Sequence, residues 1–410
     1  MTRTSLDCLL QRICVFTGSR AEYGIVKPLL ERIREEPDLD LAIIASGSHL
    51  APEHGRTVEQ ILADGFAVAE ELEILLASDT PAGTCKAAGL AMIGLGEAFR
   101  RLAPDILVLV GDRYETLAAA FAATVCRLPI AHLHGGEASF GAMDEAFRHA
   151  ITKMAHLHFT STEAYRQRVI QLGEDPAQVF FVGALALEGL SKTRLLDRAG
   201  VEQALGLSLG ERAVLVTFHP ATADPEPAAD QIDALVAVLA ARDDLTVVCT
   251  RANADPAGRL VNARLEELAA RAPGRVALFS ALGSPLYWST MAQVAAVVGN
   301  SSSGIIEAPS LHVPTLNIGD RQAGRVRAES VIDCAATAGA ISAGLERVLS
   351  VEMQGLARQT ANPYEKDNTA AAILAVLRST APAGLGRKVF HDLPGSGAAS
   401  LAGDPRRSSR

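Results

Sequence analysis

The sequence has no surplus of basic residues and no long apolar run. Its 38 lysines and arginines are outnumbered by 47 aspartates and glutamates, which gives a formal net charge of -9. Such a chain lacks the broad basic surface that follows a phosphate backbone, so we expect no nucleic-acid partner. No run of 18 apolar residues occurs, so we expect no membrane partner. The six cysteines include no C-x-x-C pair, which is typical of reduced thiols in a cytoplasmic protein.

Two cofactor signatures are also missing. No G-x-G-x-x-G follows the first predicted strand, which argues against a bound nicotinamide. Alternation along a strand puts His132 and His134 on one face, and His156 and His158 repeat that spacing. No cysteine or carboxylate stands at a typical ligand offset from these histidines. The sequence therefore predicts neither a metal nor another cofactor.

Length and periodicity predict an α/β protein of two domains. At 410 residues the chain exceeds what one hydrophobic core usually holds, and 49% of its residues are hydrophobic. Short β-branched runs alternate with longer helical patterns, which is typical of a parallel sheet covered by helices. These runs span residues 13–16, 41–45, 106–110, 129–133 and 179–182, and then 213–218, 245–249, 276–279, 294–298 and 315–318. We expect two doubly wound, Rossmann-like domains with a central cleft.

The predicted boundary between the domains lies in the segment 183–200, where one strand and helix rhythm stops before the next begins. Residues 1–190 are assigned to an N-terminal domain and residues 191–380 to a C-terminal domain. From 381 to 410 the composition turns to glycine, proline, serine and arginine, which predicts a partly disordered tail.

In a doubly wound sheet, ligands bind beyond the carboxyl ends of the strands, so polar residues there are candidate site residues. A carboxylate such as Asp112 can remove or deliver a proton. Alternatively, Asp112 caps the next helix while Arg113 pairs with Glu115. The candidates in the first half are Arg20, Glu22, Asp112, Arg113, His134, Glu137, Asp144 and Arg148.

The sharpest feature of the second half is the run 299–307, GNSSSGIIE, between a predicted strand and a helix. Amides at a helix start and serine hydroxyls can hold a diphosphate, and Glu307 can accept hydrogen bonds from ribose hydroxyls. A serine-rich helix cap is the alternative. Arg321 adds a guanidinium suited to phosphate. The candidates here are His219, Asn253, Ser301, Ser302, Ser303, Glu307 and Arg321.

With these residues in place, the sequence resembles the hydrolysing UDP-N-acetylglucosamine 2-epimerase family, which includes enzymes of the bacterial sialic acid pathway. The resemblance runs from about residue 13 to 377 and is most specific at 111–113, 135–149, 299–307 and 319–322. It implies a fold like the GT-B glycosyltransferases, with the sugar and the catalytic residues on the side of domain 1–190 and the nucleotide held by domain 191–380. It also implies a nucleotide-sugar substrate, no metal or nicotinamide, and a homodimer or homotetramer.

Carried over position by position, the resemblance gives roles to most of the candidates. Many family members have a catalytic glutamate where this chain has His134, so His134 or Glu137 would take that role. Catalytic positions fall on Asp112, Asp144 and His219, and binding positions on Arg20, Arg113, Arg148, Asn253, Ser301, Ser302, Glu307 and Arg321. Glu22 and Ser303 complete the predicted binding set.

The implied reaction is elimination of the nucleotide together with the hydrogen on carbon 2, followed by hydration with inverted configuration. The preferred interpretation is conversion of UDP-N-acetylglucosamine to N-acetylmannosamine and UDP, for the synthesis of sialic-type acids. The same reaction on UDP- or GDP-linked N,N'-diacetylbacillosamine, for legionaminic acid, is an alternative. A GT-B glycosyltransferase and a nucleotide-sugar sensor without turnover are further alternatives, because a fold does not fix a function.

Overall fold

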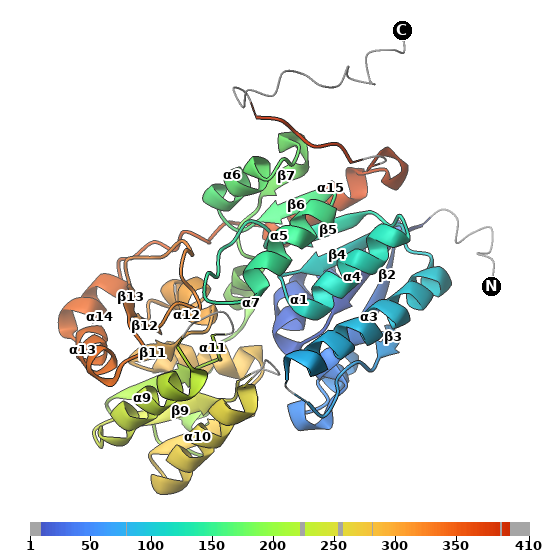
Figure 1. Cartoon of the computed structure of the whole chain (residues 1–410). Helices are drawn as coiled ribbons and strands as arrows, with labels where there is room; N and C mark the ends of the chain where they lie inside the picture. The colour runs from blue at the N-terminus through green and yellow to red at the C-terminus, as the bar shows by residue number, and fades with distance from the viewer. Residues whose placement is uncertain are drawn as a thin grey trace.

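The computed structural model describes residues 10–78, 80–221, 226–252, 257–280, 282–385 and 388–393. Two parallel sheets, each covered by helices, form the two domains (Figure 1). The first sheet has the strand order β3-β2-β1-β4-β5-β6-β7 and the second has the order β10-β9-β8-β11-β12-β13. In both sheets the order reverses direction beside the first strand, β1 or β8, which is the doubly wound arrangement.

The strands are short and separated by helices. They are β1 Gln11–Thr17, β2 Leu39–Ser46, β3 Val68–Leu72, β4 Ile106–Val110, β5 Ile130–Leu133, β6 Leu157–Thr160, β7 Val179–Phe181, β8 Ala213–Thr217, β9 Thr246–Thr250, β10 Val276–Phe279, β11 Ala296–Gly299, β12 Thr315–Ile318 and β13 Val331–Cys334. The helices are α1 Arg20–Glu35, α2 Val58–Ala63, α3 Pro81–Leu102, α4 Tyr114–Val125, α5 Asp144–Met154, α6 Glu163–Gln171, α7 Leu185–Lys192, α8 Arg198–Leu205, α9 Ala228–Ala240, α10 Gly258–Arg271, α11 Ser284–Gln293, α12 Ser303–Ile306, α13 Ala338–Val348, α14 Val351–Ala357 and α15 Thr369–Ser379.

Burial on both faces explains why the central strands are continuous apolar runs. Along β1, Ile13 and Val15 join the core on one face of the sheet, while Cys14 and Phe16 join the core on the other. All five residues of β4 are buried. Helices therefore cover both faces of the first sheet, as parallel sheets require.

The predicted fold class is confirmed, and each predicted strand is present within two residues of its expected ends. Three strands were missed: β3, β6 and β13. The sequences VAEEL of β3 and VIDC of β13 carry acidic residues because these are edge strands with one partner each. Strand β6 reads LHFT, and its histidine hides the apolar pattern, although all four residues are buried.

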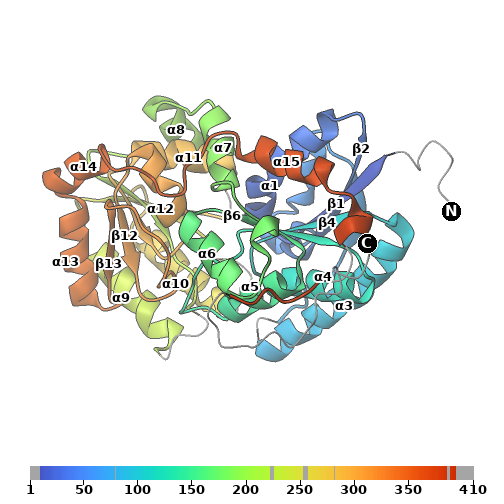
Figure 2. The same cartoon turned by 90° about the horizontal axis from the view of Figure 1, so that it is seen from above.

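The last helix does not follow the predicted division of the chain. The span 191–380 placed α15 with the second sheet, whereas Ala370, Ile373 and Leu377 are buried in the core of the first domain, next to α1. Figure 2 shows α15 and α1 side by side. The described part of the tail also returns to the first domain, where the Lys388 ammonium contacts the backbone oxygens of Thr152 and Lys153. Residues 386–387 and 394–410 lie outside the described residues.

The segment 183–200, predicted as a linker, contains α7 and the start of α8. Helix α7 packs against α1, so the connection is a folded part of the molecule. The exact domain bounds stay a prediction. Within the described ranges, no helix is both long and apolar enough to cross a membrane.

Candidate active site

A cavity of about 890 Å³ lies at the carboxyl ends of strands from both sheets. Residues from the turns after β1, β4 and β5 form its first-domain wall, and residues after β8, β9, β11 and β12 form its second-domain wall. This is where open parallel sheets bind ligands. The predicted site residues that line it are Arg20, Glu22, Asp112, Arg113, His134, Glu137, Asp144, His219, Ser301, Ser302, Ser303, Glu307 and Arg321.

Two predicted residues are not among them. Asn253 lies outside the described residues. Arg148 does not line the cavity, because its side chain is only 1% exposed and lies behind Asp112. Its Nε donates to Asp112 Oδ2 at 2.8 Å, and its Nη1 donates to Glu145 Oε2 at 2.6 Å. The prediction that Arg148 binds substrate is therefore not supported by its position; the guanidinium fixes the Asp112 carboxylate instead.

The alternative reading of Asp112 as a helix cap is also tested by the structure. The N-cap of α4 is Arg113, whose side chain makes no capping hydrogen bond, so Asp112 does not occupy the cap position. The other half of this alternative holds, because Arg113 Nε donates to Glu115 Oε1 at 2.7 Å. Asp112 is thus held by Arg148 from behind while it lines the cavity, an arrangement that aims a carboxylate at a bound ligand.

His134 and Glu137 form a buried pair at the end of β5. His134 Nδ1 lies 2.7 Å from Glu137 Oε1, which also accepts a hydrogen bond from Ser161 Oγ at 2.7 Å. Burial alone would raise the pKa of Glu137, but the nearby Arg325 guanidinium and His134 together hold that pKa well below its usual range. Glu137 is therefore a carboxylate that orients the imidazole, and both residues line the cavity.

The backbone at His134 has φ of +66°, in the left-handed region that few residues other than glycine adopt. Its amide still donates to Phe159 O at 2.9 Å. A non-glycine residue in this region costs on the order of 1 kcal/mol, and such strain gathers at functional sites. Among the described non-glycine residues with positive φ, His134 is the one that lines the cavity.

The serine turn after β11 forms the second-domain wall. Gly299 has φ of +132°, and a Cβ there would meet the Thr217 carbonyl oxygen, so the tight turn requires glycine. Ser303 Oγ bonds the Tyr287 hydroxyl at 2.7 Å. Glu307 Oε1 accepts a hydrogen bond from Trp288 Nε1 at 2.9 Å. Helix α12 spans only Ser303–Ile306, so an anion here would depend on local amides and hydroxyls more than on a helix dipole.

The backbone of His219 is clamped to the same turn. The Asn300 amide accepts from His219 N at 2.7 Å and donates to His219 O at 2.8 Å. Arg321 Nη1 in turn donates to Asn300 O at 3.0 Å. Two predicted residues, His219 and Arg321, are therefore fixed around Asn300, which was not among the predicted site residues.

His132 and His158, one from each predicted histidine pair, contact different residues. His132 Nε2 contacts Gly111 O at 2.8 Å, while His158 Nε2 contacts Glu174 Oε2 at 3.0 Å. Across the described part of the chain, no group of three or more histidine, cysteine, aspartate or glutamate side chains is arranged to hold a metal ion.

Glu22 lines the cavity and also caps its own helix. Its Oε2 accepts hydrogen bonds from Gly18 N at 2.6 Å and Ser19 N at 3.2 Å, in a capping box with Ser19. Burial, and then the nearby Glu115 carboxylate, raise its pKa to about 8.

The raised pKa of Glu22 predicts a pH dependence of stability. Between its usual value of 4.5 and about 8, the native state keeps a proton that the unfolded state has lost. The free energy of unfolding should therefore fall as pH rises through this window and level off above it. Glu22→Gln should flatten the dependence, and the exposed Glu59→Gln should leave it unchanged. Urea unfolding between pH 5 and 8.5 measures this; equal slopes in all three proteins would contradict it.

Comparison with known proteins adds to this geometry. A family model described as UDP-N-acetylglucosamine 2-epimerase matches residues 31–378. The chain belongs to the UDP-N-acetylglucosamine 2-epimerase family. It is 39% identical, over 79% of this chain and 84% of the relative, to the GDP/UDP-N,N'-diacetylbacillosamine 2-epimerase (hydrolyzing) of Campylobacter jejuni. It is 34% identical to the polysialic acid biosynthesis protein P7 of Escherichia coli, over 94% of this chain and 98% of that protein.

Solved structures of this epimerase family share the fold. The UDP-N-acetylglucosamine 2-epimerase of Neisseria meningitidis, solved with UDP-N-acetylglucosamine bound, superposes with a TM-score of 0.74 at 18% identity, covering 90% of this chain and 100% of that one. A Listeria monocytogenes protein described as a UDP-N-acetylglucosamine 2-epimerase gives a TM-score of 0.73 at 21% identity, covering 90% and 96%. At these identities the likeness shows the two-domain GT-B-like fold alone.

Proposed function

We propose that this member of the epimerase family is a hydrolysing 2-epimerase of a nucleotide-linked 2-acetamido sugar. One observation carries the proposal: the cavity brings the carboxylates Asp112 and Asp144 and the imidazole of His134 from one domain opposite the serine turn of the other. The first group supplies proton transfer, and the second supplies donors for a diphosphate.

The proposed reaction has two stages. A base removes the proton from carbon 2, the electron pair of that bond forms a double bond to carbon 1, and the bond from carbon 1 to the diphosphate oxygen breaks. Water then adds its oxygen to carbon 1, while a proton is delivered to carbon 2 from the opposite face. Asp112, Asp144 and His134 are the candidates for these transfers, and His219 with Arg321 faces the departing diphosphate.

The comparison of relatives favours one substrate. Relatives named as diacetylbacillosamine 2-epimerases are 39% and 35% identical to this chain, whereas two named UDP-N-acetylglucosamine 2-epimerases are 29% and 22% identical. Apolar side chains also line the cavity, among them Ile25, Leu75, Leu76 and Ala87, and apolar lining suits a sugar with a methyl group at carbon 6. We therefore propose the UDP-linked 2,4-diacetamido-trideoxy sugar as the preferred substrate, in place of UDP-N-acetylglucosamine.

The reaction type is tested by incubating the purified protein with nucleotide sugar in deuterated water, without an acceptor. We expect free nucleotide and a free 2-epimerised sugar carrying deuterium at carbon 2, because the original proton leaves before the new one arrives. Mass spectrometry and NMR of the products measure this. Retention of the original hydrogen would exclude elimination, and binding without turnover would favour a sensor.

The substrate is tested by comparing kcat/KM for the two UDP sugars, since specificity is a ratio of these values. We expect a preference of about tenfold or more for the diacetylated trideoxy sugar, the range that one apolar group in a pocket can give. A preference of similar size for UDP-N-acetylglucosamine would overturn the proposed substrate but leave the proposed reaction type in place. Leu76→Asn should reduce the preference by lowering kcat/KM for the trideoxy sugar more than for UDP-N-acetylglucosamine.

A further inference from the structure

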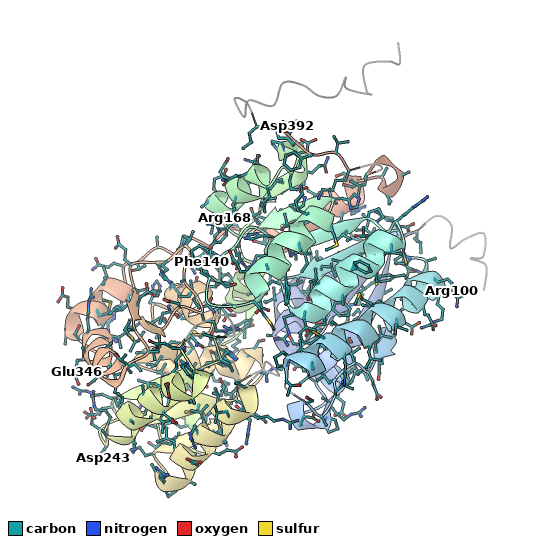
Figure 3. The ribbon with its side chains drawn as sticks, viewed as in Figure 1. Arg100, Phe140, Arg168, Asp243, Glu346 and Asp392 are labelled. Carbon is teal, nitrogen blue, oxygen red and sulfur yellow. The ribbon has the colours of Figure 1, made fainter. Side chains whose placement is uncertain are left out.

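The loop that carries His134 and Glu137 touches the second domain directly. This loop runs from His134 to Met143, between β5 and α5, and it meets residues 320–326, which follow β12. Phe140 N donates to Ala323 O at 3.2 Å, and Gly141 N donates to Asp320 O at 3.1 Å. Figure 3 labels Phe140 where the two domains meet. We call these two segments together the interdomain bridge.

The fit at the bridge is close. A Cβ on Gly141 would lie 2.6 Å from the carbonyl carbon of Asp320, nearer than real Cβ contacts come. The bridge is also anchored behind, because Tyr165 of α6 accepts a hydrogen bond from Val326 N at 2.8 Å. These contacts therefore fix the position of the His134 loop relative to the second domain when the bridge is formed.

Arg325 is the charged residue at the centre of the bridge. Its side chain, 9% exposed, comes from the second domain and reaches the loop of the first. Its Nε donates to Ala138 O at 3.1 Å. Its Nη1 lies 2.8 Å from Glu137 Oε2, close enough for an ion pair, although the contact is not aligned as a hydrogen bond. Glu137 in turn holds His134 Nδ1 through its other oxygen.

The same segment also contacts the serine turn after β11. Arg321 and Gln322 both donate to Asn300 O, at 3.0 and 2.9 Å, and Asn300 clamps the backbone of His219. Residues 320–326 thus contact the serine turn through Arg321 and Gln322. The same segment contacts the His134 loop through Asp320, Ala323 and Arg325. Because this segment contacts both the serine turn and the His134 loop, it fixes their relative position. It can do so only while the two domains are in contact.

We propose that Arg325 is a positioning residue, which sets the His134 and Glu137 pair for catalysis when the two domains close around the nucleotide. This proposal rests on the proposed function, because it concerns the same reaction. Arg325 acts through Glu137, and the second domain thereby completes a catalytic arrangement that the first domain does not hold alone.

The surroundings of Glu137 give this role a specific signature. The charged or titratable groups around its carboxylate are Arg325, His134, Arg148, Tyr165 and Tyr364. Arg325 is the largest of the influences that lower its pKa. Loss of this cation should therefore raise the pKa of Glu137, so that the carboxylate is lost at a higher pH during acidification. A residue with only a structural role would not move that limb of the pH profile.

The experiment compares Arg325→Gln with the wild type and with Arg327→Gln. Arg327 lies two residues further on, pairs with Asp333 of its own domain at 3.0 Å and donates to Gln322 O at 3.0 Å. It is therefore a matched control for the loss of a cation from this segment that is not paired with Glu137. For Arg325→Gln we expect kcat to fall about tenfold or more, UDP affinity to change less than about threefold, and the acid limb of kcat to move to higher pH. Arg325→Lys should move the acid limb part of the way back toward that of the wild type, because the positive charge returns without the planar guanidinium. Arg327→Gln should leave the acid limb where it is in the wild type.

Each outcome separates the possibilities. An inactive wild type refutes the proposed function itself. With an active wild type, an unmoved acid limb in Arg325→Gln overturns the positioning role, and a loss of UDP affinity that matches the loss of kcat makes Arg325 a ligand contact instead. Gly141→Ala tests the bridge without changing any charge: it should lower kcat while leaving the acid limb in place, and unchanged kcat would overturn the requirement for a closed bridge.

Discussion

Asp112→Asn should lower kcat by roughly a hundredfold or more while UDP affinity stays nearly unchanged. The substitution removes a proton-transfer group but keeps the shape and one hydrogen-bonding oxygen for Arg148. Steady-state kinetics and isothermal titration with UDP measure the two effects. Turnover near that of the wild type would remove Asp112 from the catalytic set.

Glu145→Gln is the matched control for this result. Glu145 also pairs with Arg148, but it does not line the cavity. Its neutralisation therefore takes a similar charge away from the same guanidinium without touching a bound sugar. We expect kcat to fall less than about tenfold; an equal loss in both variants would mean that the charge balance around Arg148, and not proton transfer at Asp112, limits the rate.

Arg148→Met should lower the free energy of unfolding by about 3 kcal/mol, because it removes a buried guanidinium that pairs with two half-buried carboxylates. Asp112 and Glu145 both lose their guanidinium partner, as do Ser139 Oγ and the backbone oxygen of Glu137. The midpoint of urea unfolding measures the change. Arg148→Lys should recover only part of it, because an ammonium cannot reproduce these contacts together.

The control for Arg148 is Arg378→Met. Arg378 pairs with Glu36 and Asp38 at the surface, where its side chain is 42% exposed. Exposed ion pairs contribute little to stability. A loss in this variant as large as that of Arg148→Met would show that burial is not what makes the Arg148 network important.

Positions at strand ends could be predicted from the sequence because buried parallel strands are recognisable as short apolar runs. Once Ile106–Val110 is identified as a strand, Asp112 must lie at its carboxyl end, and neighbouring parallel strands bring His134 to the same edge. The cavity follows from this topology. How deeply each side chain is buried could not be predicted from the sequence. Arg148 was therefore predicted to bind the ligand, whereas its side chain lies behind Asp112.

Contacts between distant segments were beyond prediction for a different reason. Arg325 follows Arg321 by four residues in a loop without any periodicity, and nothing local says that it crosses to Glu137. Likewise, α15 has an apolar face that fits either domain by pattern alone, and only the shape of the surface beside α1 decides where it packs. Such choices depend on tertiary complementarity, to which a local pattern is blind.

The place of α15 has a consequence for how the protein is made. During synthesis, α1 and the first sheet leave the ribosome long before Ala370, Ile373 and Leu377, which complete their core. Domains usually fold as units from the N-terminus as the chain emerges. Here the second domain can complete its core first, since its own sheet and helices end by residue 357. The apolar surface of the first domain that α15 covers therefore stays exposed to solvent until α15 has been synthesised and packs against it.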